Sequence, residues 1–228
     1  AKMSLAIPFQ YKPGTHFVYN NVGPYLAGIL VQRRSGCDLV SYLTPRLFKH
    51  LGIKRPTWET DPLGNSFGAG GLFLTLSELH KFGLFYLNKG KWNGKQILSE
   101  KWIEESTAAS DTDNYGYLFW RGEYNSYRAD GKYSQISMIL PDKNAVISMV
   151  AECRNGEELM SALYDLDVQS YRLLLHNCEK GKTKRAQTAR LYKIDGLDSE
   201  ADEGAGIDLG RRKIIADPPF LAEMIPAK

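Results

Sequence analysis

The first half of the chain carries hydrophobic residues at helical spacing. Tyr25, Leu26, Ile29 and Leu30 would fall on one face of a helix that follows an amide-rich junction. Two arginines and Gly36 close this segment, and such residues are typical of a helix C-terminus. The pattern therefore predicts a helix that starts just after the junction and ends before Gly36.

Three further helices are expected downstream. Asp38 can cap the first of them, and Pro45 predicts a break or a new first turn within it. Thr75 and Glu78 have the spacing of a capping box at the start of the second helix. Residues 99–107 give a short third helix. The first half of the chain is therefore predicted to be mostly helical.

Residues 54–71 interrupt these helices and contain two prolines and four glycines. This composition predicts a long loop, and long loops inside compact domains are often functional. Gly64 to Gly68 match the Gly-x-Ser-x-Gly pattern, with Ser66 in the place of a nucleophile. That motif requires a strand before it and a helix after it, and neither is predicted here. We interpret the match as a coincidence within a glycine-rich loop.

From about Tyr115 the hydrophobic period changes from helical to strand-like. Consecutive strands are predicted as far as residue 153, and Pro141 to Asn144 is a strong hairpin signal. A long closing helix is expected over 157–177. The fold class is therefore predicted to be α+β. An antiparallel sheet over roughly 115–153 would carry the closing helix on one face, and the mostly helical segment 19–107 would form the other lobe.

The tail from residue 179 onward has a different composition. A basic block comes first and an acidic block follows, a pattern that is usually solvated and flexible. The stretches RLYKI (190–194) and RRKIIA (211–216) have strand character and could pair as a marginal hairpin. We therefore divide the chain into a domain over 1–178 and a tail or extra hairpin of unknown role over 179–228.

Composition narrows the functional classes. The formal net charge of +3 is too small to argue for nucleic acid or an anionic membrane surface. No window approaches the roughly 18 apolar residues of a membrane span, and no leader pattern is recognised. The three cysteines and four histidines show no ligand spacing, so neither a metal nor another cofactor is expected. The cysteines leave the compartment open.

The most informative short motif is Tyr19-Asn20-Asn21, directly before the first helix. In one reading it is an ordinary junction, with a half-buried tyrosine and Asn21 as the helix N-cap. In the other it is a catalytic edge, where the phenol and the amide face a substrate. The three residues by themselves favour the structural reading.

Four segments that occur in this order resemble the serine beta-lactamase-like family, which includes class C beta-lactamases, D-alanyl-D-alanine carboxypeptidases (penicillin-binding proteins) and related esterases. They cover residues 13–36, 43–53, 68–107 and 127–153. The resemblance implies that Tyr19 and Asn21 match the family's Tyr-x-Asn motif. The phenol would take part in proton transfer and the amide would hold the substrate or a catalytic lysine. The resemblance also points to a bacterial protein and is compatible with an extracytoplasmic one.

The resemblance places a second part of the substrate site on a later strand. The family's Lys/His-x-Gly motif aligns with Ala129, Asp130 and Gly131, and the following GKYSQ occupies the place of a glycine-rich turn. The sequence departs from the pattern here, because Ala129 replaces a cationic or imidazole side chain. Asp130 adds a negative charge that would disfavour a substrate with a carboxylate.

The larger departure concerns the nucleophile. The family's serine lies in Ser-x-x-Lys on a helix upstream of the tyrosine motif, and no lysine of this chain has a serine three residues before it. We expect the first strands and that helix to precede Ala1, so that the chain is the C-terminal portion of the fold. The sheet would then be completed by strand exchange, a partner fragment or strands from the tail.

Two functional hypotheses follow. The first is a serine hydrolase that acts by acyl transfer on a small-molecule or peptide amide or ester, with the nucleophile outside this chain. The second is a non-catalytic relative that serves as a binding or regulatory module. Whether the chain belongs to an active enzyme depends on the Ser-x-x-Lys segment.

Overall fold

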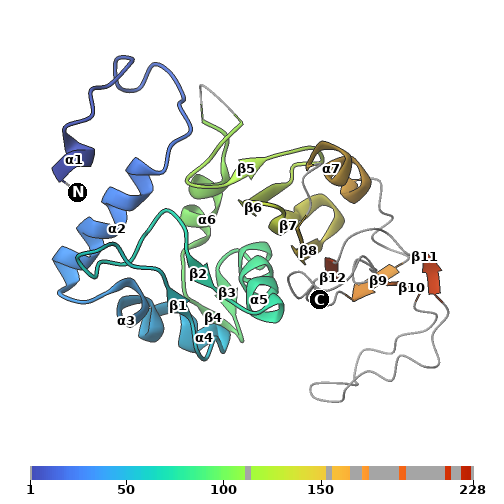
Figure 1. Ribbon diagram of the computed structural model, residues 1–228. Coiled ribbons are helices and arrows are strands. Elements are labelled where there is room, and N and C mark those ends of the chain that lie inside the picture. Colours follow the sequence, from blue (N-terminus) through green and yellow to red (C-terminus); the bar gives the residue numbers. More distant parts are fainter. Residues whose placement is uncertain are drawn as a thin grey trace.

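The computed structural model describes residues 2–110, 114–152 and 156–164, and the backbone of four further strands at 171–174, 190–193, 214–216 and 222–226. Helices dominate the first half of the chain and an antiparallel sheet dominates the second, so the α+β prediction is confirmed (Figure 1). The helical elements are α1 (Lys2–Leu5), α2 (Val22–Ser35), α3 (Leu39–Leu43), the π-helical turn Thr44–Phe48, α4 (Lys49–Leu51), α5 (Leu76–Leu87), α6 (Glu100–Thr107) and α7 (Gly156–Tyr164).

The helix boundaries follow the capping signals of the sequence. Gly36 adopts a φ of 72° and its N–H donates to the Gln32 carbonyl, which ends α2. The Asp38 carboxylate accepts from the Ser41 N–H at 2.9 Å and caps α3. The backbone changes from α-helical to π-helical at Thr44–Phe48, at the position where Pro45 was expected to interrupt the helix.

The helix α5 begins with the predicted capping box. The Thr75 hydroxyl accepts from the Glu78 N–H, and the Glu78 carboxylate accepts from the Thr75 N–H at 2.9 Å. Ser99 caps α6 by accepting from the Trp102 N–H at 3.2 Å. Two small hairpins flank these helices: β1 (Thr57–Trp58) with β2 (Leu72–Phe73), and β3 (Lys91–Trp92) with β4 (Lys95–Gln96).

The large sheet has eight strands in the order β11-β10-β9-β12-β8-β7-β6-β5, and every neighbouring pair is antiparallel. Its strands are β5 (Trp120–Arg121), β6 (Tyr127–Gly131), β7 (Gln135–Leu140), β8 (Ala145–Val150), β9 (Tyr171–Leu174), β10 (Arg190–Lys193), β11 (Ile214–Ala216) and β12 (Ala222–Pro226). The predicted hairpin between β7 and β8 is confirmed, with Asn144 in the left-handed conformation at φ 47°.

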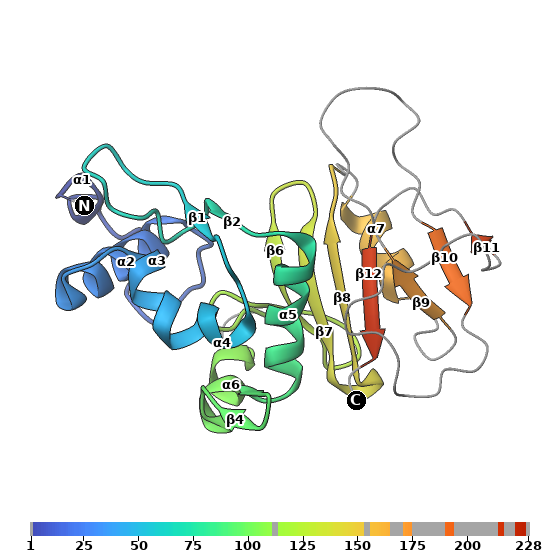
Figure 2. The same ribbon diagram turned by 90° about the horizontal axis from the view of Figure 1, so that it is seen from below.

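The sheet is covered on both faces by helices (Figure 2). Leu159 and Leu163 of α7 pack with Met138, Ile147 and neighbouring residues on one face. On the other face, helix α5 contributes Phe85 and Tyr86 to a cluster that includes Ile139 and Val146 of the sheet. The two faces alternate along each strand, as the period of two requires.

A glycine allows the close contact between α5 and the sheet. A Cβ atom built on Gly83 would lie 2.5 Å from both the Ser137 hydroxyl oxygen and a Val146 methyl carbon. Real Cβ atoms do not approach other atoms this closely, so the helix can sit at this height only with glycine at position 83. The buried His80 lies on the same helix surface, and its Nδ1 is 3.0 Å from the Ser148 hydroxyl oxygen.

The prediction of one long helix over 157–177 is wrong. Helix α7 ends at Tyr164, and Tyr171–Leu174 forms strand β9 between β10 and β12. A short apolar run fits either a helix or a strand by periodicity, and pairing partners that are distant in sequence decided this case. Residues 165–170 lie outside the described part of the chain.

The tail contributes strands to the sheet. β10 and β11, within RLYKI and RRKIIA, pair with each other as the sequence suggested. The strand beside β8 is β12, which pairs with it from Ala222↔Met149 to Pro226↔Ala145. The division at residues 178 and 179 stays a prediction, because most of the tail lies outside the described residues. No helix among the described residues is long and apolar enough to cross a membrane.

Candidate active site

Tyr19 lies in the loop that enters helix α2, beside the outer strand β5. Its side chain is 54% exposed. Its ring stacks on Trp120 with centroids 5.3 Å apart and meets the ring of Tyr115 edge-on at 6.0 Å. The aromatic neighbours therefore fix one side of the phenol ring and leave the other side accessible to solvent.

Asn20, and not Asn21, caps helix α2. The Asn20 Oδ1 accepts from the Gly23 N–H at 2.9 Å, and its Nδ2 donates to the Val18 carbonyl at 2.9 Å. Asn21 occupies the N-cap position but its side chain makes no capping hydrogen bond. The expectation that Asn21 caps the helix is therefore wrong. Capping by Asn20 leaves the Asn21 amide available for another partner.

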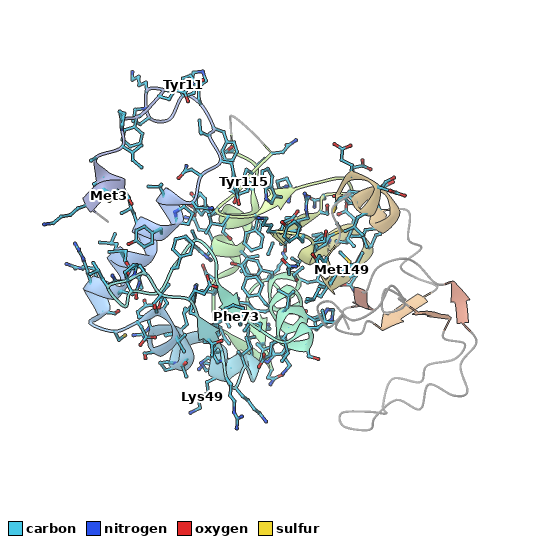
Figure 3. The ribbon with its side chains drawn as sticks, in the orientation of Figure 1. Met3, Tyr11, Lys49, Phe73, Tyr115 and Met149 are labelled. Carbon is cyan, nitrogen blue, oxygen red and sulfur yellow. The ribbon has the colours of Figure 1, made fainter. Side chains whose placement is uncertain are left out.

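The aromatic cluster around Tyr19 joins the N-terminal loop to the sheet edge. Phe17 packs against Tyr115 at 5.1 Å, and Tyr115 meets Trp120 at 4.6 Å. Burial raises the pKa of Tyr115, and the nearby Tyr19 phenol adds to the increase because two phenolates would repel each other. Figure 3 shows Tyr115 in this position, between the loop and the sheet.

The second predicted part of the site lies on β6. Ala129 pairs with Ser137 of β7 and packs against the cluster on the α5 face of the sheet. Asp130 lies on the opposite face, because side chains alternate along a strand. Its carboxylate accepts from Arg128 Nε at 2.9 Å. The negative charge that we expected to act at the site is thus offset by Arg128.

Gly131 closes the strand against Gln135. A Cβ atom at this position would lie 3.1 Å from the Gln135 Cβ and 3.2 Å from its carbonyl oxygen, so glycine suits the tight pairing. The turn that follows holds two residues in the left-handed conformation, Tyr133 at φ 64° and Ser134 at φ 76°. Such values are uncommon outside glycine, and they mark this turn as a strained segment beside the candidate site.

The structure places Tyr19 against β5 and the second predicted part of the site, residues 129–131, on the neighbouring strand β6. Trp120, on which Tyr19 stacks, is the antiparallel partner of Arg128. Its ring therefore shares a strand face with Arg128 and Asp130, whereas Ala129 points to the other face. Among the described residues, the ring contacts of Tyr19 are with Tyr115 and Trp120.

Ser66 has a structural role. It is 2% exposed, and its hydroxyl accepts from the Leu39 N–H at 3.2 Å. The Gln32 side-chain amide makes two hydrogen bonds to the Ser66 backbone. Its oxygen accepts from the Ser66 N–H at 2.8 Å, and its nitrogen donates to the Ser66 carbonyl at 3.2 Å. A buried hydroxyl with these partners is not placed to attack a substrate, in agreement with the interpretation of GNSFG as a coincidence.

Sequence reasoning missed three contributors to this region: Asn20, Tyr115 and Trp120. Two adjacent amides do not reveal which of them caps a helix, because the choice depends on the backbone angles at the junction. The aromatic residues after position 114 could have been noticed as a cluster, but their contact with Tyr19 spans about a hundred residues of sequence. No group of three or more potential metal ligands occurs among the described residues.

The profile of the Beta-lactamase family matches residues 2–170, so the chain belongs to that family. It is 24% identical over 159 residues to an N-acetylmuramyl-L-alanine amidase of Bacillus subtilis, a match that covers 50% of this chain and 36% of the amidase. The fold and the sequence thus define a protein of the beta-lactamase and penicillin-binding-protein type.

Solved structures show the same fold. A candidate 6-aminohexanoate-dimer hydrolase from Bacillus anthracis is 22% identical, with a TM-score of 0.64 over 71% of this chain and 46% of that chain. A penicillin-binding protein from Bacillus halodurans is 20% identical, with a TM-score of 0.53 over 69% of this chain and 58% of that chain. The chain therefore spans about half the length of these relatives, or less.

Proposed function

We propose that this chain supplies the tyrosine and amide side of a serine hydrolase site that acts by acyl transfer on an amide or ester. The observation that carries the proposal is the division of roles in Tyr19-Asn20-Asn21. Asn20 caps the helix, which leaves the Asn21 side chain free of the capping role. Trp120 holds the Tyr19 ring at the sheet edge with its other side exposed.

In the proposed reaction a serine oxygen adds to the substrate carbonyl and loses its proton. The tetrahedral intermediate then collapses, the bond to the leaving group breaks, and the leaving group takes up a proton. Water attacks the resulting ester in the same manner and releases the acid. The Tyr19 phenol would carry the proton from the serine oxygen to the leaving group, and later from the attacking water to the serine oxygen. The Asn21 amide would donate a hydrogen bond to the substrate.

The nucleophile is proposed to come from a Ser-x-x-Lys segment that this sequence does not contain. A phenol keeps its proton at neutral pH unless a nearby cation stabilises the phenolate, and only the phenolate can accept a proton from the serine. Aromatic rings pack against Tyr19 in the described structure, so the lysine of that segment is the proposed cation. This assignment leaves Ser66 out of the reaction, because its hydroxyl is buried and already hydrogen-bonded.

The substrate is proposed to be a small-molecule or peptide acyl compound. The names of two relatives, an amidase and a 6-aminohexanoate-dimer hydrolase, support hydrolysis as the reaction class. The identities of 24% and 22% are too low to transfer their particular substrates. No nucleic acid, metal or cofactor enters the proposed reaction.

The test is intact mass after incubation with a reporter beta-lactam and, separately, with a fluorophosphonate. Two proteins are compared: this chain, and a chimera in which this chain replaces the matched region of the Bacillus anthracis relative. We expect no adduct on this chain and one adduct on the chimera. An adduct on this chain by itself would show a nucleophile within it and overturn the assignment.

The role of Tyr19 is tested in the same chimera. Tyr19→Phe should slow adduct formation by about 100-fold or more, the usual contribution of a positioned proton-transfer group. Tyr124→Phe is a matched control, because Tyr124 is 53% exposed and Tyr19 54%. An unchanged rate in Tyr19→Phe would contradict the proposed role.

The alternative function is a non-catalytic binding or regulatory module of the Beta-lactamase family. In that case the chimera would still form an adduct, but the natural protein that contains this chain would not. Mass labelling of the natural protein separates the two candidates.

A further inference from the structure

Leu118 is a strained residue in the loop that leads into strand β5. It adopts the left-handed backbone conformation at φ 68°, in which the side chain of an L-residue crowds the backbone. Its side chain is also 55% exposed. Leu118 therefore combines two unfavourable features, a strained backbone and an apolar side chain in water.

Hydrogen bonds within the loop hold the backbone on both sides of Leu118. An isolated bridge between Tyr115 and Trp120 closes the loop, and Figure 3 shows Tyr115 at its start. The Gly116 N–H donates to the Phe119 carbonyl at 2.8 Å, and the Leu118 N–H donates to the Gly116 carbonyl at 2.9 Å. The surrounding structure thus keeps position 118 in the left-handed conformation, although the residue there is not glycine.

The two neighbours of Leu118 have structural roles. The Tyr117 N–H donates to the Ser106 carbonyl at 2.8 Å, and the Tyr117 phenol donates to the Glu105 carboxylate at 3.1 Å. Phe119 is 5% exposed and lies in the apolar cluster on the α5 face of the sheet. Within the described part of the chain, Leu118 belongs to neither of the two apolar clusters. Strain that core packing does not offset is typical of residues with a functional role.

The loop of Leu118 touches both predicted parts of the candidate site. The two residues that close the loop are the rings in contact with Tyr19. The second of them, Trp120, pairs with Arg128 of strand β6. Phe119 lies in the same apolar cluster as Ala129. The exposed Leu118 side chain is therefore carried by a loop that is fixed against Tyr19 and against β6.

The charges of the adjoining part of β6 offset each other. Arg128 Nε donates to the Asp130 carboxylate at 2.9 Å, and Ala129 between them is uncharged. A charged group of a substrate would have to compete with this pair, whereas an uncharged group would not. Together with the exposed isobutyl group of Leu118, the pairing favours an uncharged and apolar ligand.

We propose that Leu118 is a specificity-determining residue whose side chain contacts an uncharged hydrocarbon group of the acyl substrate. The inference rests on the proposed function, because this group would belong to the amide or ester that is hydrolysed at the site. Contact with the substrate would remove the Leu118 side chain from water, and this burial would favour substrates with a long alkyl or aryl group over small ones.

The test uses the chimera and two fluorophosphonates, one with an ethyl group and one with an octyl group on phosphorus. Leu118→Gly should slow adduct formation with the octyl reagent by about tenfold, because the alkyl chain loses its apolar contact, and with the ethyl reagent by less than about twofold. Leu118→Met keeps an apolar side chain and should preserve the ratio of the two rates. Equal slowing with both reagents, or no slowing, would overturn the proposal.

Tyr124→Gly is the matched control. Tyr124 also has a positive φ, 52°, and is 53% exposed, but it lies in the loop between β5 and β6, where its ring is 6.0 Å from that of Tyr164. This substitution should leave the ratio of the two rates unchanged. A change as large as that in Leu118→Gly would show that the release of backbone strain alters the ratio, and would overturn the proposal.

The melting temperature of this chain separates a specificity role from a packing role. Glycine adopts a positive φ without strain, and this gain offsets its greater freedom in the unfolded chain. Leu118→Gly should therefore not lower the melting temperature. A decrease of several degrees would show that the Leu118 side chain is needed for folding, and would overturn the proposal.

Binding of hexanamide to this chain gives a readout that does not depend on a nucleophile. The signal is the indole N–H resonance of Trp120 in nuclear magnetic resonance spectra, identified by its loss in Trp120→Phe. We expect hexanamide to shift this resonance, and Leu118→Gly to weaken the binding by about fivefold through the lost apolar contact. Tyr124→Gly should leave the binding unchanged.

The two readouts separate the proposal from the proposed function. If the chimera forms no adduct but hexanamide binding depends on Leu118, the specificity role stands and the hydrolase function fails. If adducts form but neither the ratio of rates nor hexanamide binding depends on Leu118, the function stands and the specificity role fails. If no adduct forms and hexanamide does not bind, both fail.

Discussion

The interior of the sheet and the N-terminal edge of the molecule are built in opposite ways. Around β7 and β8, the residues Met138, Ile139, Val146 and Ile147 are fully buried between α5 and α7. Along residues 2–21, large apolar side chains such as Phe9 are exposed and the candidate catalytic Tyr19 is half exposed. Both regions belong to the same family match. The difference shows that packing fixes the side chains of the interior, whereas those of the edge remain accessible to solvent.

The largest effect should come from truncation of a side chain in the interior. Phe85→Ala should lower the free energy of unfolding by about 4 kcal/mol, because Phe85 is 0% exposed and its removal leaves a cavity. Phe9→Ala is the contrasting substitution and should change it by less than about 0.5 kcal/mol in this chain. Urea denaturation followed by circular dichroism measures both. Similar changes in the free energy of unfolding for the two variants would contradict the contrast between the interior and the edge.

The next effect concerns pH. Burial lowers the pKa of His80 to about 4, from about 6.5 for an exposed histidine. Between these two pH values the unfolded chain binds a proton that the folded chain does not, so the protein loses stability as the pH falls from 6.5 to 4. The loss over the whole window is about 3 kcal/mol, at about 1.4 kcal/mol for each unit of pKa.

The measurement is the free energy of unfolding of the natural sequence and of His80→Gln as a function of pH. Asp38, Asp61 and Glu78 also have lowered pKa values and weaken the fold in acid. They are present in both proteins, so the difference between the two curves isolates His80. Parallel curves between pH 6.5 and 4 would show that His80 is not held neutral by burial.

A smaller effect should distinguish the two amides at the edge. Asn20→Ala should cost about 1 kcal/mol, the usual contribution of a helix cap, because it removes the acceptor for the Gly23 N–H. Asn21→Ala should leave the stability unchanged, since its side chain makes no capping hydrogen bond. Thermal denaturation of the two variants provides the measurement. The opposite ranking would restore Asn21 as the cap and weaken its assignment to the substrate.

The smallest effect is expected at the ion pair of β6. Asp130→Asn should lower the free energy of unfolding by less than about 1 kcal/mol, because Arg128 and Asp130 are partly solvated and such pairs contribute little. The loss should diminish further in 1 M salt. Chemical denaturation at low and high salt measures it. A loss well above 1 kcal/mol would indicate that the ion pair between Arg128 and Asp130 stabilises the fold more than a partly solvated pair should.

Much of the fold could be predicted from the sequence where local signals agreed with each other. The capping box at Thr75 and Glu78, the cap at Asp38 and the hairpin ending at Asn144 all rest on interactions within a few residues. The closing helix could not be predicted to its true length. Its last part became strand β9, and that outcome depended on pairing with β10 and β12.

The residues of the candidate site could be predicted from sequence motifs, but the contacts between their side chains could not. The sequence singled out Tyr19 and Asn21, and the roles assigned to them and to Ala129, Asp130 and Gly131 remain proposals. Only the structure showed that Asn20 takes the capping role and that Arg128 offsets the charge of Asp130. These contacts depend on backbone angles and on strand register, which a short motif does not encode.

The sequence by itself determined the capping box of α5, the cap of α3 and the strand period of β7 and β8, because these follow from interactions between residues close together in the chain. The tertiary structure decided which strand lies beside β8, which aromatic rings hold Tyr19 and which apolar residues stay uncovered. Those outcomes depend on surfaces that meet only after the chain has folded.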